Sequence, residues 1–179
     1  MSFLSQETFE EIRTEAPEGG RYINPSKHLT EEDRRLRFVG PGITGFEAWT
    51  TEDKPIRWEQ KPAELPDNIK PDLKGRITSK RFIAGVVWDY AEDNFKILQI
   101  TQRSIMEQLD KFVKDSEYGD PLGYDIKLSK KGKGLDTEYT LIAAPPKPLH
   151  PDIQEAFDAS GIKINAMFEQ GGDPFPADS

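Results

Sequence analysis

The clearest pattern of hydrophobic and polar positions lies in the middle of the chain, over residues 80–143. Two apolar runs, Lys80–Tyr90 and Phe95–Thr101, predict strands separated by a short polar turn at Ala91–Asn94. The segment Gln102–Asp115 that follows has the spacing of an amphipathic helix. Its apolar residues recur three and four positions apart and share one face: Ile105, Met106, Leu109, Phe112 and Val113.

The ends of this helix and the strands beyond it can also be predicted. Thr101 is expected as the N-cap. Tyr124–Lys130 and Leu135–Ala144 alternate apolar and polar residues, as strands with one wet face do, and they flank a KGKG turn at Lys131–Gly134. An earlier strand is expected around Arg34–Trp49, where glycines and a proline indicate a sharp bend.

The resulting order is strand, strand, strand, helix, strand, strand, which is the chain order of an OB-fold. We therefore predict a mainly β protein with one or two helices, a five-stranded Greek-key barrel whose helix lies between strands 3 and 4. The expected organisation is an N-terminal arm (1–33) with a short helix at Gln6–Arg13, an OB-fold domain (34–144), a proline-rich linker with a short helix (145–164) and a disordered acidic tail (165–179).

Composition narrows the classes of protein. The 179 residues contain no cysteine and two distant histidines, so neither a disulfide nor a metal site is expected, and no cofactor is implied. A chain without cysteine fits a reducing compartment. There is no run of about 18 apolar residues and no signal-peptide layout at the start, so we expect a cytoplasmic protein without a membrane span.

The charge is unevenly distributed. The net charge is −8, and residues 151–179 hold six acidic residues and one lysine. In contrast, residues 70–87 hold five basic residues and one acid, and Lys127–Lys133 holds four lysines and no acid. The chain is acidic at its end and locally basic on the predicted barrel, so its total charge does not argue against a nucleic-acid partner.

Binding a single strand without sequence preference requires cations along a groove and aromatic faces on which bases stack. Candidates for this role lie on the predicted barrel and its loops: Trp58, Lys74, Arg76, Lys80, Arg81, Trp88, Tyr90, Lys127, Lys130, Lys131 and Lys133. The alternative is that most of the aromatic residues belong to the core, as we expect for Phe82 and Phe95. Trp58 lies in a polar, proline-rich stretch with little nearby to pack on, which favours function.

One short sequence pattern could indicate an enzyme. Asp120 and the triplet Asp125–Lys127 loosely match the acid, acid-x-Lys pattern of metal-dependent nucleases. The two acids are only five residues apart, too close for the first to come from an earlier strand end. No phosphate-binding loop, dinucleotide turn or nucleophile with a partner base is present, so no enzymatic activity is expected.

The segments VVWDYAEDNFKILQITQRSI and GDPLGYDIKLSKKGKGLDTEYTLIAAP together resemble the core of single-stranded DNA-binding proteins of tailed bacteriophages. The resemblance covers about residues 34–144. It implies an OB-fold protein that coats unwound DNA during replication and recombination, in the host cytoplasm if phage-encoded. It implicates a set of binding residues within those named above: Arg81, Trp88, Tyr90, Lys127, Lys130, Lys131 and Lys133.

The ending EQGGDPFPADS is similar to the tip of bacterial single-stranded DNA-binding proteins, which recruits replication and repair enzymes. This similarity implies a partner-binding role for Asp173, Pro174 and Phe175. An acidic tail is also expected to compete with DNA for a cationic groove. The alternatives to DNA binding are an OB-fold protein-interaction module and an RNA-binding protein. The sequence leaves the oligomeric state open.

Overall fold

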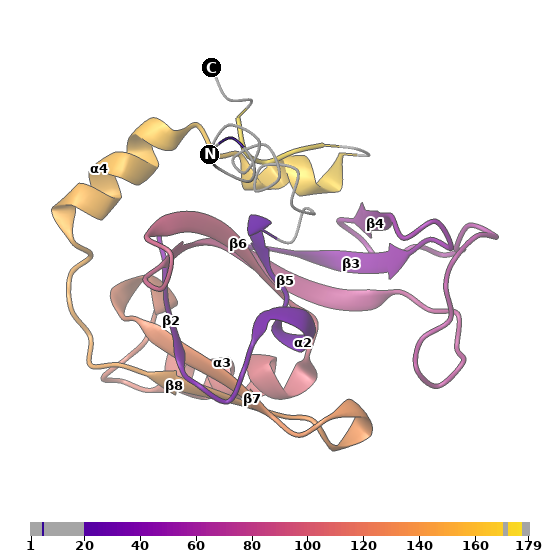
Figure 1. Cartoon of the computed structure of the whole chain (residues 1–179), viewed down its shortest axis with the longest axis horizontal. Helices are drawn as coiled ribbons and strands as arrows, with labels where there is room; N and C mark the ends of the chain where they lie inside the picture. Colours follow the sequence, from indigo (N-terminus) through magenta and orange to yellow (C-terminus); the bar gives the residue numbers. More distant parts are fainter. Residues whose placement is uncertain (1–4, 6–19, 170–171, 177–179) are drawn as a thin grey trace.

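The chain folds into a strongly curled mixed β-sheet that forms a half-barrel, so the prediction of a mainly β protein is confirmed (Figure 1). The computed structural model describes residues 5, 20–169 and 172–176. The described strands are β1 (Tyr22–Ile23), β2 (Arg34–Phe38), β3 (Ile43–Trp49), β4 (Pro55–Trp58), β5 (Lys80–Asp89), β6 (Asn94–Ile100), β7 (Ile126–Lys131) and β8 (Glu138–Ala143). The described α-helices are α2 (Pro25–His28), α3 (Arg103–Lys114) and α4 (Pro151–Ser160), and the 3₁₀ helices are η2 (Pro121–Gly123), η3 (Gly134–Asp136) and η4 (Ile164–Phe168).

The elements predicted over residues 80–143 are confirmed in order and type. β5 and β6 pair antiparallel from Ile83 opposite Ile100 to Asp89 opposite Asn94, and β7 pairs antiparallel with β8. The predicted N-cap of α3 is wrong by one residue. Gln102 occupies that position and makes no side-chain capping hydrogen bond.

The expected first strand is split by a bend into β2 and β3, and both halves pair antiparallel with β5. The bend falls at the glycines, as predicted. A Cβ atom on Gly40 would come within 2.9 Å of the Phe157 ring, so the side chain of a larger residue does not fit there. The sheet curls because β2 also pairs with β7, which continues to β8.

The concave side of this sheet holds the inner core. Leu36 of β2, Val87 of β5 and Leu98 of β6 are fully buried against Ile126 and Leu128 of β7. α3 covers this core with Ile105 and Leu109, which are buried, and with Met106 and Phe112, which are partly buried. Val113, predicted on the same helix face, is 42% exposed and is not among the residues that pack on this core.

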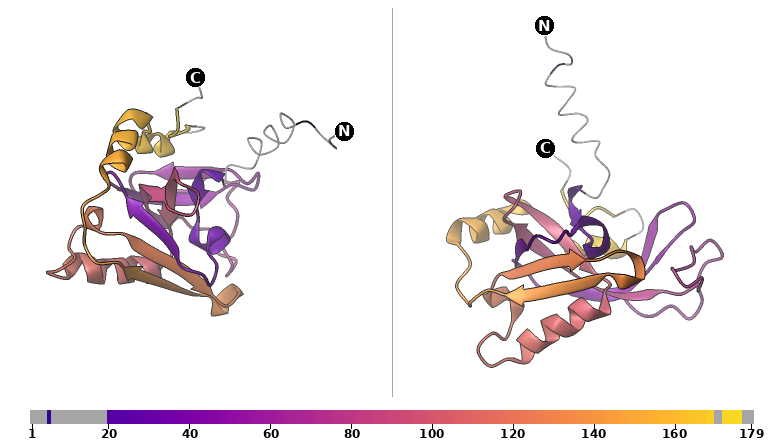
Figure 2. Two further views of the ribbon diagram at one scale, coloured as in Figure 1. Left: turned by 60° about the vertical axis from the view of Figure 1, so that its left-hand side comes forward. Right: turned by 60° about the horizontal axis from the view of Figure 1, so that its bottom comes forward.

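The outer side of β5 and β6 is also covered, and the cover is the C-terminal part of the chain (Figure 2). Phe82, Ala84, Val86 and Ile97 are buried there together with Met167 and Phe175. α4 contributes partly buried Ile153 and Phe157, and η4 contributes Ile164 and Phe168. We call this set of residues the outer cluster.

The expectation of a disordered tail over residues 165–179 is not confirmed in the residues that the structure describes. Met167 is 2% exposed and Phe175 is 9% exposed, because the outer face of the sheet offers them an apolar surface. The short helix expected before the tail is present as α4, which ends at Gly161 in the left-handed conformation (φ 71°). Residues 170–171 and 177–179 lie outside the described residues.

The loosely packed arm expected over residues 1–33 is likewise corrected for its described part. β1 adds in parallel to the edge of β6, and Ile23 and Leu29 are 1% and 3% exposed, because both enter the inner core. The helix expected at Gln6–Arg13 lies outside the described residues. Among the helices that the structure describes, none is long and apolar enough to cross a membrane.

Candidate nucleic-acid interface

The end of the molecule beyond the barrel is built from β3, β4 and the first half of β5, which extend past the curled part of the sheet (Figure 1). Arg81 lies directly opposite Phe46, and Phe46 lies directly opposite Trp58. Residues opposite each other in antiparallel strands point to the same face of the sheet. The three side chains therefore form a row across three strands, which we call the aromatic row.

Two contacts hold the guanidinium group of Arg81 in place within the aromatic row. The Arg81 guanidinium carbon lies 4.4 Å from the centroid of the Phe46 ring, within cation–π range, and one of its nitrogens donates to Thr44 Oγ1 at 3.2 Å. Arg81 is nevertheless exposed, and Phe46 and Trp58 are partly buried. A row of two aromatic rings ending in an accessible cation matches the needs of a base and its phosphate.

An open pocket of about 650 Å³ lies beside this row. It is lined from three segments: the β4–β5 loop, the start of β5, and the beginning of α3. The lining residues are Asp72, Arg76, Thr78, Ser79, Lys80, Arg81, Thr101, Arg103 and Met106. The pocket wall therefore carries four cations and one carboxylate, together with three hydroxyl groups.

Asp72, the one acidic residue that lines the pocket, holds the β4–β5 loop in its conformation. Asp72 Oδ1 accepts hydrogen bonds from the backbone nitrogens of Lys74 (2.9 Å) and Arg76 (2.8 Å), and Gly75 turns the chain with φ 77°. Asp72 Oδ2 accepts from Arg76 Nε at 3.2 Å. The backbone hydrogen bond from Arg76 is the main cause that lowers the pKa of Asp72, which stays ionised at neutral pH. Both oxygens of this carboxylate are thus engaged by the loop itself.

The β7–β8 hairpin lies at the same end of the molecule as the β4–β5 loop in all the ribbon views (Figures 1 and 2). α3 and β8 are tied together, since Gln108 donates to the Tyr139 carbonyl (2.9 Å) and accepts from Leu141 N (2.9 Å). The middle of α3 is thereby held against β8. Lys131 and Lys133 are exposed on the hairpin.

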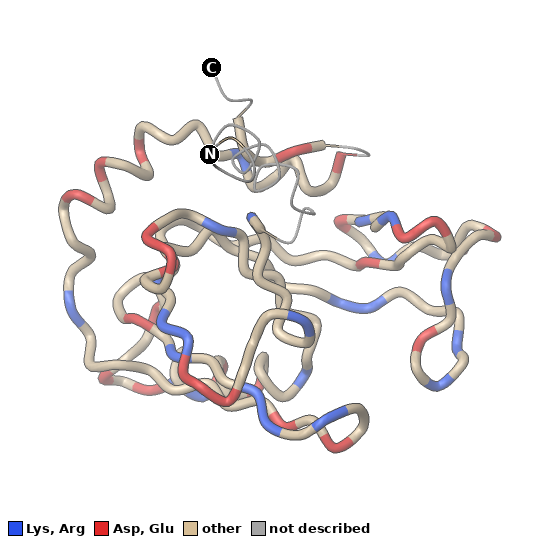
Figure 3. The backbone as a smooth tube through the Cα atoms, in the orientation of Figure 1, with Lys and Arg blue, Asp and Glu red and all other residues tan. Residues whose placement is uncertain are grey.

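At this end the loop and the hairpin carry basic and acidic positions side by side, and the start of β5 is basic (Figure 3). We call the six cations that lie there the cationic end: Arg76, Lys80, Arg81, Arg103, Lys131 and Lys133. Lys74 lies in the same loop as Arg76 and is exposed. The sequence therefore anticipated five of the six cations.

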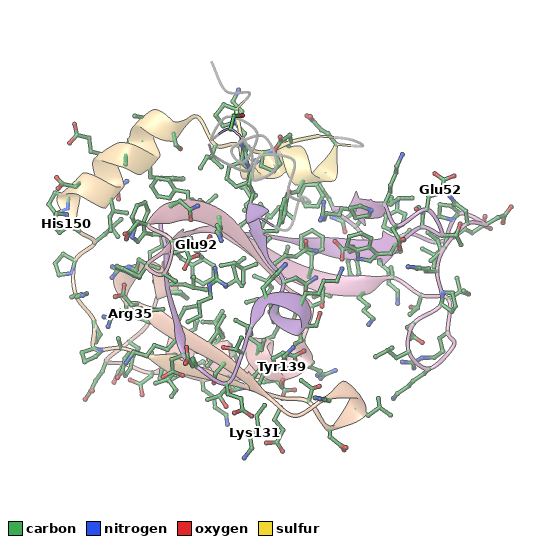
Figure 4. The ribbon with its side chains drawn as sticks, in the orientation of Figure 1. Arg35, Glu52, Glu92, Lys131, Tyr139 and His150 are labelled. Carbon is green, nitrogen blue, oxygen red and sulfur yellow. The ribbon has the colours of Figure 1, made fainter. Side chains whose placement is uncertain are left out.

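Two predicted lysines of β7 are not part of the cationic end. Lys130 Nζ donates to the Ser26 carbonyl at 2.7 Å, so this side chain ties α2 to the hairpin. Lys127 lies opposite Arg35 on β2, and Figure 4 places Arg35 away from Lys131, toward the other end of the sheet. The structure does not bring Lys127 to the cationic end.

Trp88, predicted as a stacking residue, is partly buried and packs against the outer cluster. Its ring packs edge-on against Phe95 with 5.0 Å between centroids, and Phe95 in turn lies 5.7 Å from Phe157 of α4. This position is at the opposite end of β5 from Arg81. The structure therefore separates Trp88 from the aromatic row.

Tyr90, the other predicted stacking residue beside Trp88, belongs to a buried ionic cluster. Its hydroxyl donates to Asp125 at 3.0 Å, and burial is the main cause that raises its pKa. Asp125 is fully buried and also pairs with Arg35 (2.8 Å) and Arg37 (3.2 Å). Tyr90 thus has a structural partner, and Asp125, the second acid of the loose nuclease pattern, is engaged by these contacts.

The predicted partner-binding residues at the chain end are packed against the molecule. Phe175 meets Tyr22 edge-on at 6.5 Å, and Arg21 lies 5.1 Å from its ring. Pro174 is buried, and Asp173 accepts a hydrogen bond from the Phe175 backbone nitrogen at 3.0 Å. In this arrangement the Phe175 ring is not exposed for a partner.

Two members of the interface were missed by sequence reasoning. Phe46 lies within a glycine-rich strand, and only the pairing of β3 with both β4 and β5 puts it between Trp58 and Arg81. Arg103 begins α3, and its place beside a strand end was the one available signal. Trp58 was predicted as functional but in a loop, whereas it lies in β4.

No family model, no curated protein and no solved structure matches this chain.

Proposed function

We propose that this protein is a non-catalytic, single-stranded DNA-binding protein. The observation that carries the proposal is the aromatic row of Trp58, Phe46 and Arg81 beside a pocket lined by four cations. Aromatic faces bind bases of any sequence, and cations bind the backbone that connects them. Because these groups lie side by side, a strand can use both at once.

We further propose that the sheet is an OB-fold. β2 and β3 would act as its bent first strand, β5 and β6 as the second and third, and β7 and β8 as the fourth and fifth. The position of α3 between β6 and β7, and the pairing of β2 with both β5 and β7, support this assignment. The loops that flank the cationic end would then be those that border the binding groove of such barrels.

The proposed binding surface differs from the one expected at Trp88 and Tyr90. We infer that the strand crosses the cationic end, where Phe46 and Trp58 offer partly exposed rings. The coating and protection of unwound DNA in replication and recombination, with or without a phage origin, is part of the same proposal. It rests on the resemblance of residues 34–144.

Trp58 and Trp88 provide a matched test of this surface. Titration of the full chain with a dT oligonucleotide should quench tryptophan fluorescence saturably. Trp58→Ala should weaken binding by roughly 1–3 kcal/mol, because one stacking face is lost. Trp88→Ala is the control, and once its stability is confirmed at the assay temperature it should bind like the parent. Absence of saturable binding by the parent chain would contradict the function, and the reverse order of the two variants would contradict the surface.

A second candidate function is a protein-interaction module. Leu73 is 89% exposed in the β4–β5 loop and Leu135 is 84% exposed in the β7–β8 hairpin, so two apolar side chains stand at the same end as the cations. An RNA strand would use the proposed surface as DNA does. Titration with rU in parallel with dT separates these partners, and a module for protein partners would bind neither.

A further inference from the structure

The pocket beside the aromatic row has a composition that the stacking of bases does not explain. Arg76, Lys80, Arg81 and Arg103 come from three separate segments and converge on it. Cations that repel one another are brought together by a fold at a cost, which a bound anion removes. Their convergence therefore points to an anionic ligand.

The one carboxylate in the wall does not neutralise this group. Asp72 uses one oxygen on two backbone nitrogens of its own loop and the other on Arg76. Lys80, Arg81 and Arg103 have no ion pair with it among the contacts of the described residues. Lys80 and Arg81 thus keep their charges for a ligand, and Arg103 shares its charge with the exposed side chain of Glu107.

The partners of these cations leave them accessible. Arg103 is 91% exposed and pairs only through Nε with Glu107 at 3.1 Å, on the surface of α3. Exposed pairs of this kind contribute little and are exchanged readily. Arg81 donates one nitrogen to Thr44, and the other donors of its planar group remain for a second acceptor.

The remaining lining is suited to phosphate rather than to a carboxylate alone. Thr78, Ser79 and Thr101 add hydroxyl donors, and Met106 adds an apolar wall. The guanidinium group of an arginine can donate two parallel hydrogen bonds to two oxygens of one phosphate. The volume of about 650 Å³ lies within the range of small-ligand pockets, about 300–1,000 Å³, so a phosphate can enter with its sugar attached.

We propose that this pocket holds one backbone phosphate of the bound single strand, with Arg103 as an anchoring residue. The inference rests on the proposed function and deepens it, because it assigns a defined phosphate subsite next to the aromatic row. A phosphate held there lies beside Arg81, so the attached base is delivered to Phe46 and Trp58. The register of the strand on the row is then set by the pocket.

The test is the binding of a labelled dT oligonucleotide to the full chain by fluorescence anisotropy over a range of salt concentrations. Arg103→Gln should weaken binding about three- to tenfold at low salt. The slope of log affinity against log salt should become shallower by about 0.7, which is the value for one phosphate on a single strand.

Lys114→Gln is the matched control. Lys114 lies at the other end of α3, and it forms the same kind of exposed pair with Asp110 (2.7 Å), with 75% of its side chain exposed. Its loss removes the same charge from the same helix far from the pocket. We expect affinity and salt slope to stay within twofold and 0.2 of the parent values, about the resolution of such an assay.

The outcomes separate this inference from the proposed function. If Arg103→Gln behaves like Lys114→Gln while Lys131→Gln with Lys133→Gln still weakens binding, the phosphate pocket is wrong and DNA binding stands. If the parent chain does not bind dT, the function itself fails. Inorganic phosphate should compete with dT more strongly than chloride does at equal ionic strength, and this extra competition should be lost in Arg103→Gln. Equal competition by phosphate and chloride in the parent chain would overturn the inference.

Discussion

Asp125 forms ion pairs with three cations: Arg35, Arg37 and Lys147. Its carboxylate is fully buried, and so is its partner Arg37, which is only 1% exposed. Asp125→Asn keeps the shape but leaves the Arg37 charge without its counter-ion in the core. We expect a loss of about 3–5 kcal/mol in the free energy of unfolding, measured by urea denaturation.

Asp110→Asn is the control for this substitution. It makes the same chemical change in an exposed pair with Lys114, where solvent screens the interaction, and stability should not change measurably. Equal unfolding midpoints for both variants would show that the buried ionic cluster does not stabilise the fold.

The same carboxylates predict how stability depends on pH. Burial acts to raise the pKa of Asp125, but hydrogen bonds from Arg35, Arg37 and Tyr90 outweigh it and lower the pKa below its ordinary value of 3.8. Asp89 behaves alike, with Arg34 as the main opposing partner. The unfolded chain therefore binds these protons at higher pH than the folded one.

Since the folded pKa values lie below the unfolded ones, the contribution is fully present above the unfolded value. It is lost as the pH falls through the folded values. Unfolding midpoints measured from about pH 7 to pH 2 should fall steeply below about pH 4 in the parent and more gradually in Asp125→Asn. Parallel curves for the two proteins would refute this origin of acid sensitivity.

At the residue scale, the sequence does not reveal which side chains contact one another in the folded protein. Tyr90 and Trp88 close a strand next to a polar turn, which looks like an exposed position. The partner of Tyr90 is Asp125, 35 residues further on. Trp88 packs against Phe95, which in turn contacts Phe157 of the distant α4. Such pairs are decided by strand pairing and by a distant segment, and no local pattern contains them.

At the scale of elements, the packing of the C-terminal segment on the sheet predicts a measurable contribution to stability. Phe175 and Met167 complete the outer cluster, so Phe175→Ala should lower the free energy of unfolding by about 3 kcal/mol. Leu135→Ala is the control, because that side chain is 84% exposed and its truncation should change stability by no more than about 0.5 kcal/mol. Thermal unfolding of the three proteins measures both effects. An unchanged midpoint for Phe175→Ala would instead favour a free tip that docks on partners.

Elements with a clear period were predictable, and those without one were not. The alternation in β7 and β8 and the helical spacing in α3 locate these elements to within a few residues. η4 and residues 172–176 have neither period. Residues 172–176 are also rich in proline and glycine, which is typical of disorder. They are ordered by the apolar outer face of β5 and β6, which the sequence shows only as an unbroken apolar strand.

At the scale of the whole molecule, charge and apolar cover divide the surface. The cationic end carries the proposed interface, whereas the acidic C-terminal part, with Asp152, Glu155 and Asp158 on α4, lies over the outer face of the sheet. The net charge of −8 therefore conceals a protein with two differently charged regions. Competition between tail and DNA remains a proposal, and it would have to act without displacement of the buried Phe175.

The contact between Tyr22 and Phe175 also has a consequence for how the chain is made. β5 and β6 are complete once residue 100 has been synthesised, but the outer side of these strands is covered only by residues up to 175. At about 5–20 residues per second, the nascent sheet keeps an apolar face open for roughly 4–15 s of translation. The outer face of the sheet is therefore the last part of this structure to be covered, and until then the growing chain exposes an apolar surface that the folded chain buries.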